Sequence, residues 1–334
     1  MASLRHTLKN FFGHKAIVLM YHRVADAAVD PWNLAVSPQY FNEQIAQLAK
    51  NFTVVPVPEL IKNLQQKKLA ANSVSVTFDD GYADNYLFAK PILERYGCPA
   101  TFFIPSHYIG QQQPFWWDSL EALLLTAPQL PQLFQITIQD EPFYFDLEAD
   151  AVLTPQLFEK HKAWRWPDAA PTRRCALYLK IWEQLKPLQL AEITTIVEDI
   201  KEWANQKPVF SDVLTPMDSS KLLDLGSNAL FTIGLHTATH PALAYHPEEL
   251  QYAEIAENKK ALRPYAPVNA VAFPYGNYNN STLAVLHKQR IDAAFTTEER
   301  SLTAKSNLHC LGRFQVKNWN GLQFEKQLRQ WLKG

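Results

Sequence analysis

The stretch Val74-Ser-Val-Thr-Phe-Asp-Asp-Gly-Tyr82 is the most informative part of the sequence about its architecture. Apolar residues at positions 74, 76 and 78 alternate with small polar ones, which predicts a buried strand. The strand ends on two adjacent carboxylates, Asp79 and Asp80. Because α/β folds place their chemistry at the carboxyl ends of strands, this pair is a candidate site. The alternative is an ordinary turn, since Asp and Gly are common turn residues.

A second predicted strand runs into two histidines. It lies in Phe231-Thr-Ile-Gly-Leu-His-Thr-Ala-Thr-His-Pro241 and ends on His236 and His240. On one helical turn this i,i+4 spacing would place both imidazoles on the same face, about 5–6 Å apart at Cβ. That arrangement is typical of a two-histidine metal site. Because the chain also has an Asp-Asp strand end, the histidines are interpreted as a ligand pair rather than as structural residues.

A third motif, Phe-Pro-Tyr-Gly at 273–276, follows another apolar run. Together with Thr77-Phe-Asp-Asp-Gly81 and His236-Thr-Ala-Thr-His-Pro241, it resembles the polysaccharide deacetylases, the NodB-homology or carbohydrate esterase 4 family. The resemblance covers residues 16–110 and 225–317. It implies a distorted, TIM-like (β/α)7 barrel that hydrolyses N-acetyl groups of an amino sugar, an N-acetylated polysaccharide or a glycan precursor.

The order of the predicted elements agrees with that fold. Strands alternate with helices from residue 16 to 104 and again from residue 230, which predicts parallel strands with right-handed crossovers. The segment 111–225 breaks this pattern and is interpreted as a mainly helical insertion over the barrel face. We therefore expect one domain, residues 1–334, with about seven parallel strands.

Several local features are predicted within this outline. Residues 84–96 read as a helix that Pro91 kinks or starts late. Inside the insertion, residues 135–145 alternate like a small hairpin, and residues 175–185 and 190–204 read as helices.

The resemblance implies a divalent metal held by Asp80, His236 and His240. One carboxylate and two imidazoles leave coordination positions open, as a catalytic metal site requires. This ligand set suits zinc first, and cobalt, nickel or iron also fit.

The resemblance also implies roles for two further residues. Asp79 would be the general base that takes a proton from the hydrolytic water. The backbone N–H of Tyr275 would stabilise the oxyanion of the tetrahedral intermediate. The structural alternatives are that Asp79 caps a turn and that Tyr275 is an ordinary packed aromatic residue.

The chain departs from the family pattern at two places. The arginine that usually opens the third motif and holds the base is replaced by Ala272 or Phe273. The Leu-x-x-His that usually supplies the general acid is missing near Leu311-Gly-Arg-Phe314, and His309 is not placed like that histidine.

A permuted branch of the family, the poly-N-acetylglucosamine deacetylases, suggests where the acid lies. There the acid histidine ends an N-terminal strand, and Tyr21-His22 after residues 16–20 is similar. His22 is therefore the expected general acid that protonates the departing nitrogen, with a packed histidine as the alternative. From placement alone, Arg313 is expected to orient Asp79 and to belong with Tyr275 and Trp117 to the substrate-binding residues.

Two more residues, Trp116 and His107, could line a sugar site, although core packing explains the tryptophans equally well. Relatives of this fold also hydrolyse other amides or O-acetyl esters, and a non-catalytic carbohydrate-binding relative is the alternative from another class. Intact acidic and histidine motifs favour the enzyme.

Composition restricts the partners. A formal net charge of −1 argues against nucleic-acid binding through a basic surface. Three widely spaced cysteines predict no disulfide framework and no cysteine-type zinc site.

The distribution of apolar residues along the chain predicts its location. The sequence has no signal h-region and no apolar run long enough for a membrane span, so the expected location is cytoplasmic. A peripheral anchor through Phe11 and Phe12 with flanking basic residues is the alternative. A cytoplasmic lipid-linked or nucleotide-linked N-acetyl sugar is then as good a substrate as a polymer.

Overall fold

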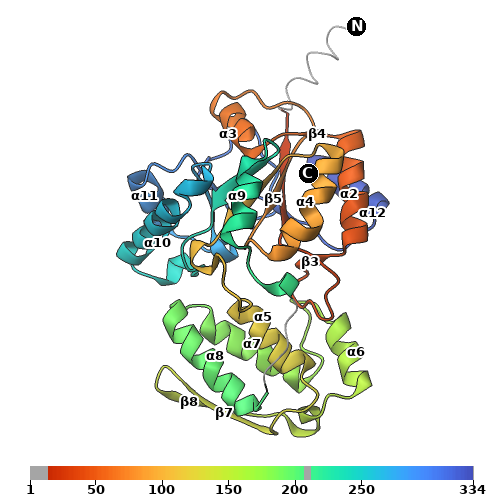
Figure 1. The fold of residues 1–334 in the computed structure, drawn as a ribbon, viewed down its shortest axis with the longest axis vertical. Helices are drawn as coiled ribbons and strands as arrows, with labels where there is room; N and C mark the ends of the chain where they lie inside the picture. Colours follow the sequence, from red (N-terminus) through yellow and green to blue (C-terminus); the bar gives the residue numbers. More distant parts are fainter. Residues whose placement is uncertain (1–13, 207–211, 334) are drawn as a thin grey trace.

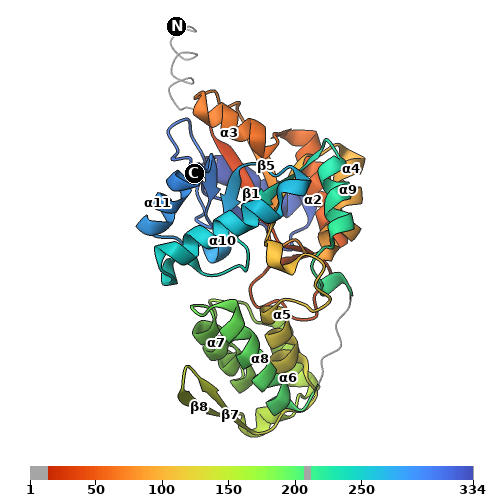
Figure 2. The same ribbon diagram turned by 60° about the vertical axis from the view of Figure 1, so that its left-hand side comes forward.

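The chain folds into a barrel and an adjoining lobe. The computed structural model describes residues 14–206 and 212–333. Figure 1 shows the barrel above, with the sheet at its centre, and below it the lobe in yellow to green. The view turned by 60° in Figure 2 shows the same separation. The surface anchor considered for Phe11 and Phe12 lies outside the described residues.

Eight parallel strands make up the central sheet, in the order β11-β10-β9-β6-β5-β1-β12, with β4 paired to β5. Their bounds are β1 Ala16–Tyr21, β4 Thr53–Val54, β5 Ser73–Phe78, β6 Ala100–Ile104, β9 Phe231–Leu235, β10 Ala270–Ala272, β11 Ala293–Phe295 and β12 Phe314–Gln315. The predicted strands are confirmed, with somewhat different ends.

The two edges of this sheet meet through the segment that precedes β12. Leu311 bridges to Phe295 of β11, and its backbone N–H donates to Ala294 O at 2.9 Å. A few residues later, Phe314 pairs with Leu19 of β1. The strand path therefore curls back on itself, and the predicted distorted barrel of about seven strands is confirmed.

Strand β5 is buried at all six positions. Helices cover the outside of the barrel while side chains fill the inside, so neither face meets solvent. Its polar side chains are satisfied locally, since Ser75 Oγ donates to Val55 O at 2.6 Å and Thr77 Oγ1 donates to Leu19 O at 2.7 Å. Small hydroxyl residues are thus tolerated in the strand that carries the two aspartates.

Helices surround the sheet. Those of the barrel are α2 Pro38–Asn51, α3 Val57–Gln65, α4 Lys90–Tyr96, α9 Ser219–Ser227, α10 Glu248–Ala261, α11 Asn280–Lys288 and α12 Gly321–Lys333. Pro91 delays the α-helix as predicted, because residues Asn85–Ala89 form a π-helical turn, η1, before α4 begins. Helix α9 was not predicted, and it packs beside β9 rather than within the lobe.

The lobe has its own apolar core. It contains α5 Trp116–Glu121, the π-helical turn η3 Ala122–Thr126, the hairpin β7 Leu133–Ile138 and β8 Glu141–Asp146, α6 Pro155–Ala163, α7 Arg173–Leu185 and α8 Leu190–Ala204. The predicted hairpin and last two helices are present. Helix α6 was missed because only one of its residues, His161, is buried, so it carries little apolar periodicity.

Short elements complete the chain. They are β2 Arg23–Val24, β3 Ala35–Val36, and the 3-10 turns η2 Ser106–Tyr108, η4 Glu148–Ala151, η5 Asp212–Leu214, η6 Leu243–Tyr245, η7 Arg263–Tyr265 and η8 Pro274–Gly276. Among the described residues, no helix has the length and apolar character needed to cross a membrane.

Candidate active site

Asp79 and Asp80 lie directly after β5, and both are buried. Asp79 N–H donates to Tyr21 O at 3.0 Å, which extends the pairing of β5 with β1 by one residue. Asp80 then turns into the left-handed region with φ 69°, and Gly81 follows at φ 71°. Backbone strain of this kind in a non-glycine residue is concentrated at functional sites. Here it turns the second carboxylate away from the strand path.

The loop after β9 carries His236 and His240 in a conformation that corrects the prediction. We expected one helical turn, but residues 236–241 are not helical, and Thr237 and His240 have φ of 62° and 63°. Thr237 Oγ1 accepts the His240 N–H at 3.1 Å and so closes a side-chain turn. Pro241 disfavours helix at the residue before it, which explains why the spacing alone was misleading.

Two residues of α10 hold this loop in place. Glu254 accepts both the backbone N–H and the hydroxyl of Thr239, at 2.8 Å and 2.7 Å. Asn258 Oδ1 accepts the His236 N–H at 3.1 Å, while its Nδ2 donates to Ile104 O of β6 at 2.9 Å. No motif in the sequence pointed to either residue, because the groups that each one binds are distant from it along the chain.

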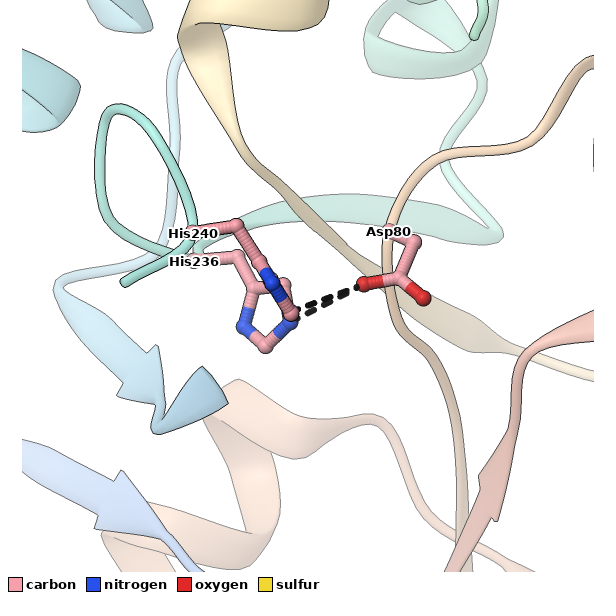
Figure 3. Close-up of side chains that lie close together, drawn as sticks. All are labelled: Asp80, His236 and His240. Carbon is pink, nitrogen blue, oxygen red and sulfur yellow. Dashed lines mark ion pairs between the residues drawn. The ribbon is translucent and has the colours of Figure 1, made fainter. Parts of the chain in front are cut away.

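Asp80, His236 and His240 converge in space (Figure 3). Asp80 Oδ1 lies 3.3 Å from His236 Nε2 and 3.2 Å from His240 Nε2, and one ligand atom of each residue lies within 4.8 Å of the others. His236 Nδ1 is 2.8 Å from Ala272 O, so a proton there leaves Nε2 free to bind a cation. The donor set fits a divalent metal with open positions.

The pKa values of the three residues follow from burial and from one another. Burial would raise the pKa of Asp80, but the two imidazoles hold it well below its usual value. Burial would lower the pKa of His236, yet the carboxylates of Asp79 and Asp80 raise it. For His240 burial prevails, and its pKa is lowered. The group therefore has an ionised carboxylate and one imidazole whose lowered pKa favours its neutral form. A metal binds these forms of both ligands.

Arg313, immediately before β12, holds Asp79 by two parallel hydrogen bonds. Its Nη1 donates to Oδ1 at 2.7 Å and its Nη2 to Oδ2 at 2.6 Å. The Nε donates to Thr296 O at 3.1 Å, which fixes the plane of the guanidinium. Burial would raise the pKa of Asp79, but Arg313 lowers it below the usual value. Arg313 is fully buried and does not line the cavity, so the structure puts it behind the carboxylate rather than against a substrate.

His22 follows β1 and faces the same carboxylate. Its Nε2 is 4.0 Å from Asp79 Oδ2, which is beyond hydrogen-bond distance. Its carbonyl accepts a hydrogen bond from Asn85 Nδ2 at 2.8 Å, which fixes the backbone at this position. Burial lowers the pKa of His22, and the carboxylates of Asp80 and Asp79 oppose that effect. His309 lies elsewhere, with its Nε2 against Ile291 O at 2.9 Å.

Tyr275 and Trp117 both pack on the metal-ligand group. Their rings lie 4.7 Å and 4.8 Å from the ring of His240. Tyr275 has φ 57°, and a Cβ on the following Gly276 would come within 2.1 Å of Thr297 Oγ1, so only glycine fits there.

The other two aromatic candidates lie differently. Trp116 forms a hydrogen bond with the Tyr275 side chain, and His107 does not line the cavity.

A cavity of about 580 Å³ opens over the two aspartates. Its size is typical of a small-molecule site. Besides the residues of the ligand group, its lining comes from the barrel loops and from the lobe: Met20, His22, Trp32, Leu34, Asp79, Trp117, Trp166, Trp182, Glu183, Lys186, Tyr245, Tyr275, Thr297 and Gln315. The lobe therefore forms one wall of the site.

Most of this wall was not predicted from the sequence. Trp32 packs against Trp182 with ring centres 4.4 Å apart and planes tilted by 36°, and its Nε1 donates to Tyr178 OH at 2.7 Å. Trp182 lies near the end of α7, between the buried residues Ile181 and Leu185, and Lys186 is the C-cap residue. Positions like these are normally part of the solvent-exposed surface of a helix. The high tryptophan content was the available signal, but it did not say which rings meet.

A family model described as polysaccharide deacetylase matches residues 66–133 and 200–294. The chain carries a polysaccharide deacetylase domain. The matched ranges of this deacetylase domain include Asp79, Asp80, His236, His240 and Tyr275, whereas His22 and Arg313 lie outside them. The match is interrupted across most of the lobe.

Two curated relatives also carry names of the deacetylase family. One is the Bacillus subtilis (strain 168) protein YxkH, named for the polysaccharide deacetylases, 33% identical over 145 residues that make up 42% of this chain and 47% of the relative. The other is the poly-beta-1,6-N-acetyl-D-glucosamine N-deacetylase of Staphylococcus epidermidis (strain ATCC 35984), 29% identical over 150 residues, 41% of this chain and 50% of the relative. The chain thus spans about half the length of the curated relatives it matches.

The deacetylase fold extends over nearly the whole chain. The structure of the Streptococcus pyogenes deacetylase PplD in complex with acetate superposes with a TM-score of 0.55 and 19% identity, covering 96% of this chain and 100% of that one. At this identity the similarity establishes the fold, including the distorted barrel, and nothing about the substrate.

Proposed function

We propose that this chain is a metal-dependent deacetylase that removes N-acetyl groups from an amino sugar within a carbohydrate. The observation that carries this proposal is the placement of Asp80, His236 and His240 beside Asp79 at the floor of a cavity walled by aromatic rings. The name of the Staphylococcus epidermidis relative, an N-deacetylase of poly-beta-1,6-N-acetyl-D-glucosamine, supports the substrate class.

Asp80, His236 and His240 are the residues that would hold the metal, and zinc is the proposed ion because of their mixed N and O donors. When bound, a divalent cation would polarise the acetyl carbonyl and lower the pKa of water.

Asp79 is the proposed general base. Arg313 keeps its carboxylate ionised and fixes both oxygens, so Asp79 can accept a proton from the attacking water without changing its orientation. A base held in this way is pre-oriented for reaction, and this lowers the cost of reaching the transition state.

His22 is the proposed general acid. Its Nε2 lies 4.0 Å from Asp79 Oδ2. Its side chain lines the cavity, where the leaving nitrogen would be. Burial lowers its pKa and so makes its imidazolium a better proton donor, while the nearby carboxylates stabilise the charged form before transfer. The Tyr275 backbone N–H is the proposed donor to the oxyanion, at a strained turn that Gly276 permits.

The test combines metal content with acetate release. Wild type, Asp80→Ala and His22→Ala would be assayed with N-acetylglucosamine oligomers and a lipid-linked N-acetyl sugar. His287→Ala, an exposed histidine away from the cavity, is the control for loss of an imidazole. We expect Asp80→Ala to lose the metal, and His22→Ala to keep it while kcat falls at least about a hundredfold.

Each other outcome has a definite meaning. Metal binding without acetate release from any of these substrates would reject N-deacetylation and favour hydrolysis of another amide or an O-acetyl ester. Failure to bind a divalent metal under any condition would reject the enzyme and favour a non-catalytic carbohydrate-binding protein.

A further inference from the structure

Lys186 is the C-cap residue that directly follows helix α7, and it lines the cavity from the lobe. Its Nζ lies 5.0 Å from the ring centre of Trp182 and 5.2 Å from that of Tyr275. The Tyr275 ring in turn lies 4.7 Å from the ring of His240. The ammonium group is therefore separated from the metal-ligand group by a single aromatic side chain.

No carboxylate of the described residues pairs with this half-buried lysine. Glu183, one turn earlier on α7, lines the same cavity but is exposed and makes no ion pair with it. The two cavity aspartates are already engaged, Asp79 by Arg313 and Asp80 by the histidines. Burial lowers the pKa of Lys186, and no nearby carboxylate offsets this.

The buried arginines of the described residues all have polar partners. Arg313 pairs with Asp79, and Arg23 pairs with Asp84 at 3.3 Å. Within the same residues, Arg174 has no carboxylate partner and donates instead to backbone carbonyls, among them that of Ala127 at 2.6 Å. Such partners are needed because desolvation of an unpaired charge is costly. Two aromatic faces offset only part of that cost, about 0.5–1 kcal/mol for a partly exposed cation. An anion that entered the cavity would supply the missing partner.

We propose that Lys186 recognises an anionic group, a carboxylate or a phosphate, carried by the N-acetylated substrate close to the acetamide that reacts. This inference rests on the proposed deacetylase function and adds a substrate class to it. With the acetamide next to Asp79, Lys186 would face the same sugar or the one adjoining it, since only the Tyr275 ring lies between. Lys186 is then a specificity-determining residue supplied by the lobe.

The test uses two pairs of substrates, each with one charged and one neutral member. One pair is a hyaluronan oligosaccharide, which contains N-acetylglucosamine and a uronic acid, and its carboxyl methyl ester. The other pair is N-acetylglucosamine 1-phosphate and the neutral methyl glycoside. The two pairs distinguish a carboxylate from a phosphate as the source of the anion. Acetate release gives kcat and KM, and tryptophan fluorescence gives binding, since Trp182 borders Lys186.

We expect wild type to prefer the charged member of at least one pair by about tenfold or more in kcat/KM, chiefly through KM. In Lys186→Gln this preference should fall to near unity, and Lys186→Arg should restore most of it. Lys180→Gln, an exposed lysine of the same helix outside the cavity, should keep the wild-type ratio.

Two results would overturn the proposal. One is a wild type that neither turns over nor binds a charged member better than its neutral partner. The other is a Lys186→Gln variant that loses activity equally on both members, as expected if Lys186 only supports the end of α7. If no substrate releases acetate, the proposed function fails, but the binding preference and its loss in Lys186→Gln still decide the role of the lysine.

Discussion

Arg313→Met removes the cation that neutralises a buried carboxylate and keeps a side chain of similar length. Arg313 and Asp79 are both essentially inaccessible to solvent and are joined by hydrogen bonds of 2.7 Å and 2.6 Å. Loss of one partner of such a pair leaves an uncompensated buried charge, which costs about 3–5 kcal/mol of unfolding free energy. We expect a loss of this size at neutral pH in the metal-free protein.

The loss should depend on pH with a definite sign. In the wild type the pKa of Asp79 is below its usual value, so the carboxylate stabilises the fold above its unfolded-state pKa, and this stabilisation is lost as pH falls through the folded-state pKa. Without Arg313, burial prevails and raises the pKa of Asp79. The variant then loses stability as pH rises from about 4, and its deficit relative to wild type widens toward neutrality.

The assay is urea unfolding in a chelating buffer at several pH values between about 5 and 8. Arg300→Met is the matched control, because that exposed arginine pairs with Glu298 at 3.2 Å and an exposed pair contributes about 0–1 kcal/mol. The double variant Arg313→Met with Asp79→Asn should be more stable than Arg313→Met alone, since no charge is left unpaired.

A loss below about 1 kcal/mol, or one equal at every pH, would show that the pair is not the desolvated ion pair inferred from its burial. A double variant no more stable than the single one would have the same meaning, because the cost would then come from lost packing of the arginine.

Three other predictions concern the supports of the site. Glu254→Ala should weaken metal affinity by about 10–100-fold without loss of folding, since Glu254 fixes Thr239 in the histidine loop; calorimetric metal titration measures this, and unchanged affinity would contradict it. Burial raises the pKa of Asp118 to about 7, so the native state keeps a proton that the unfolded state releases, and the stability should fall as pH rises from about 4 to 7. Asp118→Asn should flatten this pH dependence, which urea unfolding at several pH values measures. An unaltered pH dependence would assign it to other groups. Gly276→Ala should cost about 2–4 kcal/mol, because its φ is 63° and the new Cβ would approach Thr297 Oγ1 to 2.1 Å; a thermal shift as small as that of a surface variant would refute this.

Local patterns in the sequence were sufficient to predict the barrel and the residues that make up the metal-ligand group. Alternating apolar residues end in Asp79-Asp80 and in the histidine motif, and parallel strands bring their carboxyl ends to one edge of the sheet. Those two facts predict that Asp80, His236 and His240 meet, as they do. The prediction succeeded because it needed only the direction of each strand and its place in the sheet.

The spacing of the two histidines could not determine the conformation of the loop that carries them. The histidine loop was predicted as a helical turn, but Thr237, Pro241 and the side chains of α10 impose another shape. Its geometry depends on hydrogen bonds that the loop donates to Glu254 and Asn258, which follow later in the chain. Such partners are invisible to a local pattern.

Only the tertiary structure decided what surrounds the metal-ligand group. Arg313 reaches Asp79 across 234 positions of sequence, because the curl of the sheet brings β12 beside β1. The lobe brings Trp182 and Lys186 to the same cavity, although on α7 they read as ordinary surface. Strand periodicity is a local property of the backbone, whereas the partner of a buried charge depends on which distant segments the core packs together.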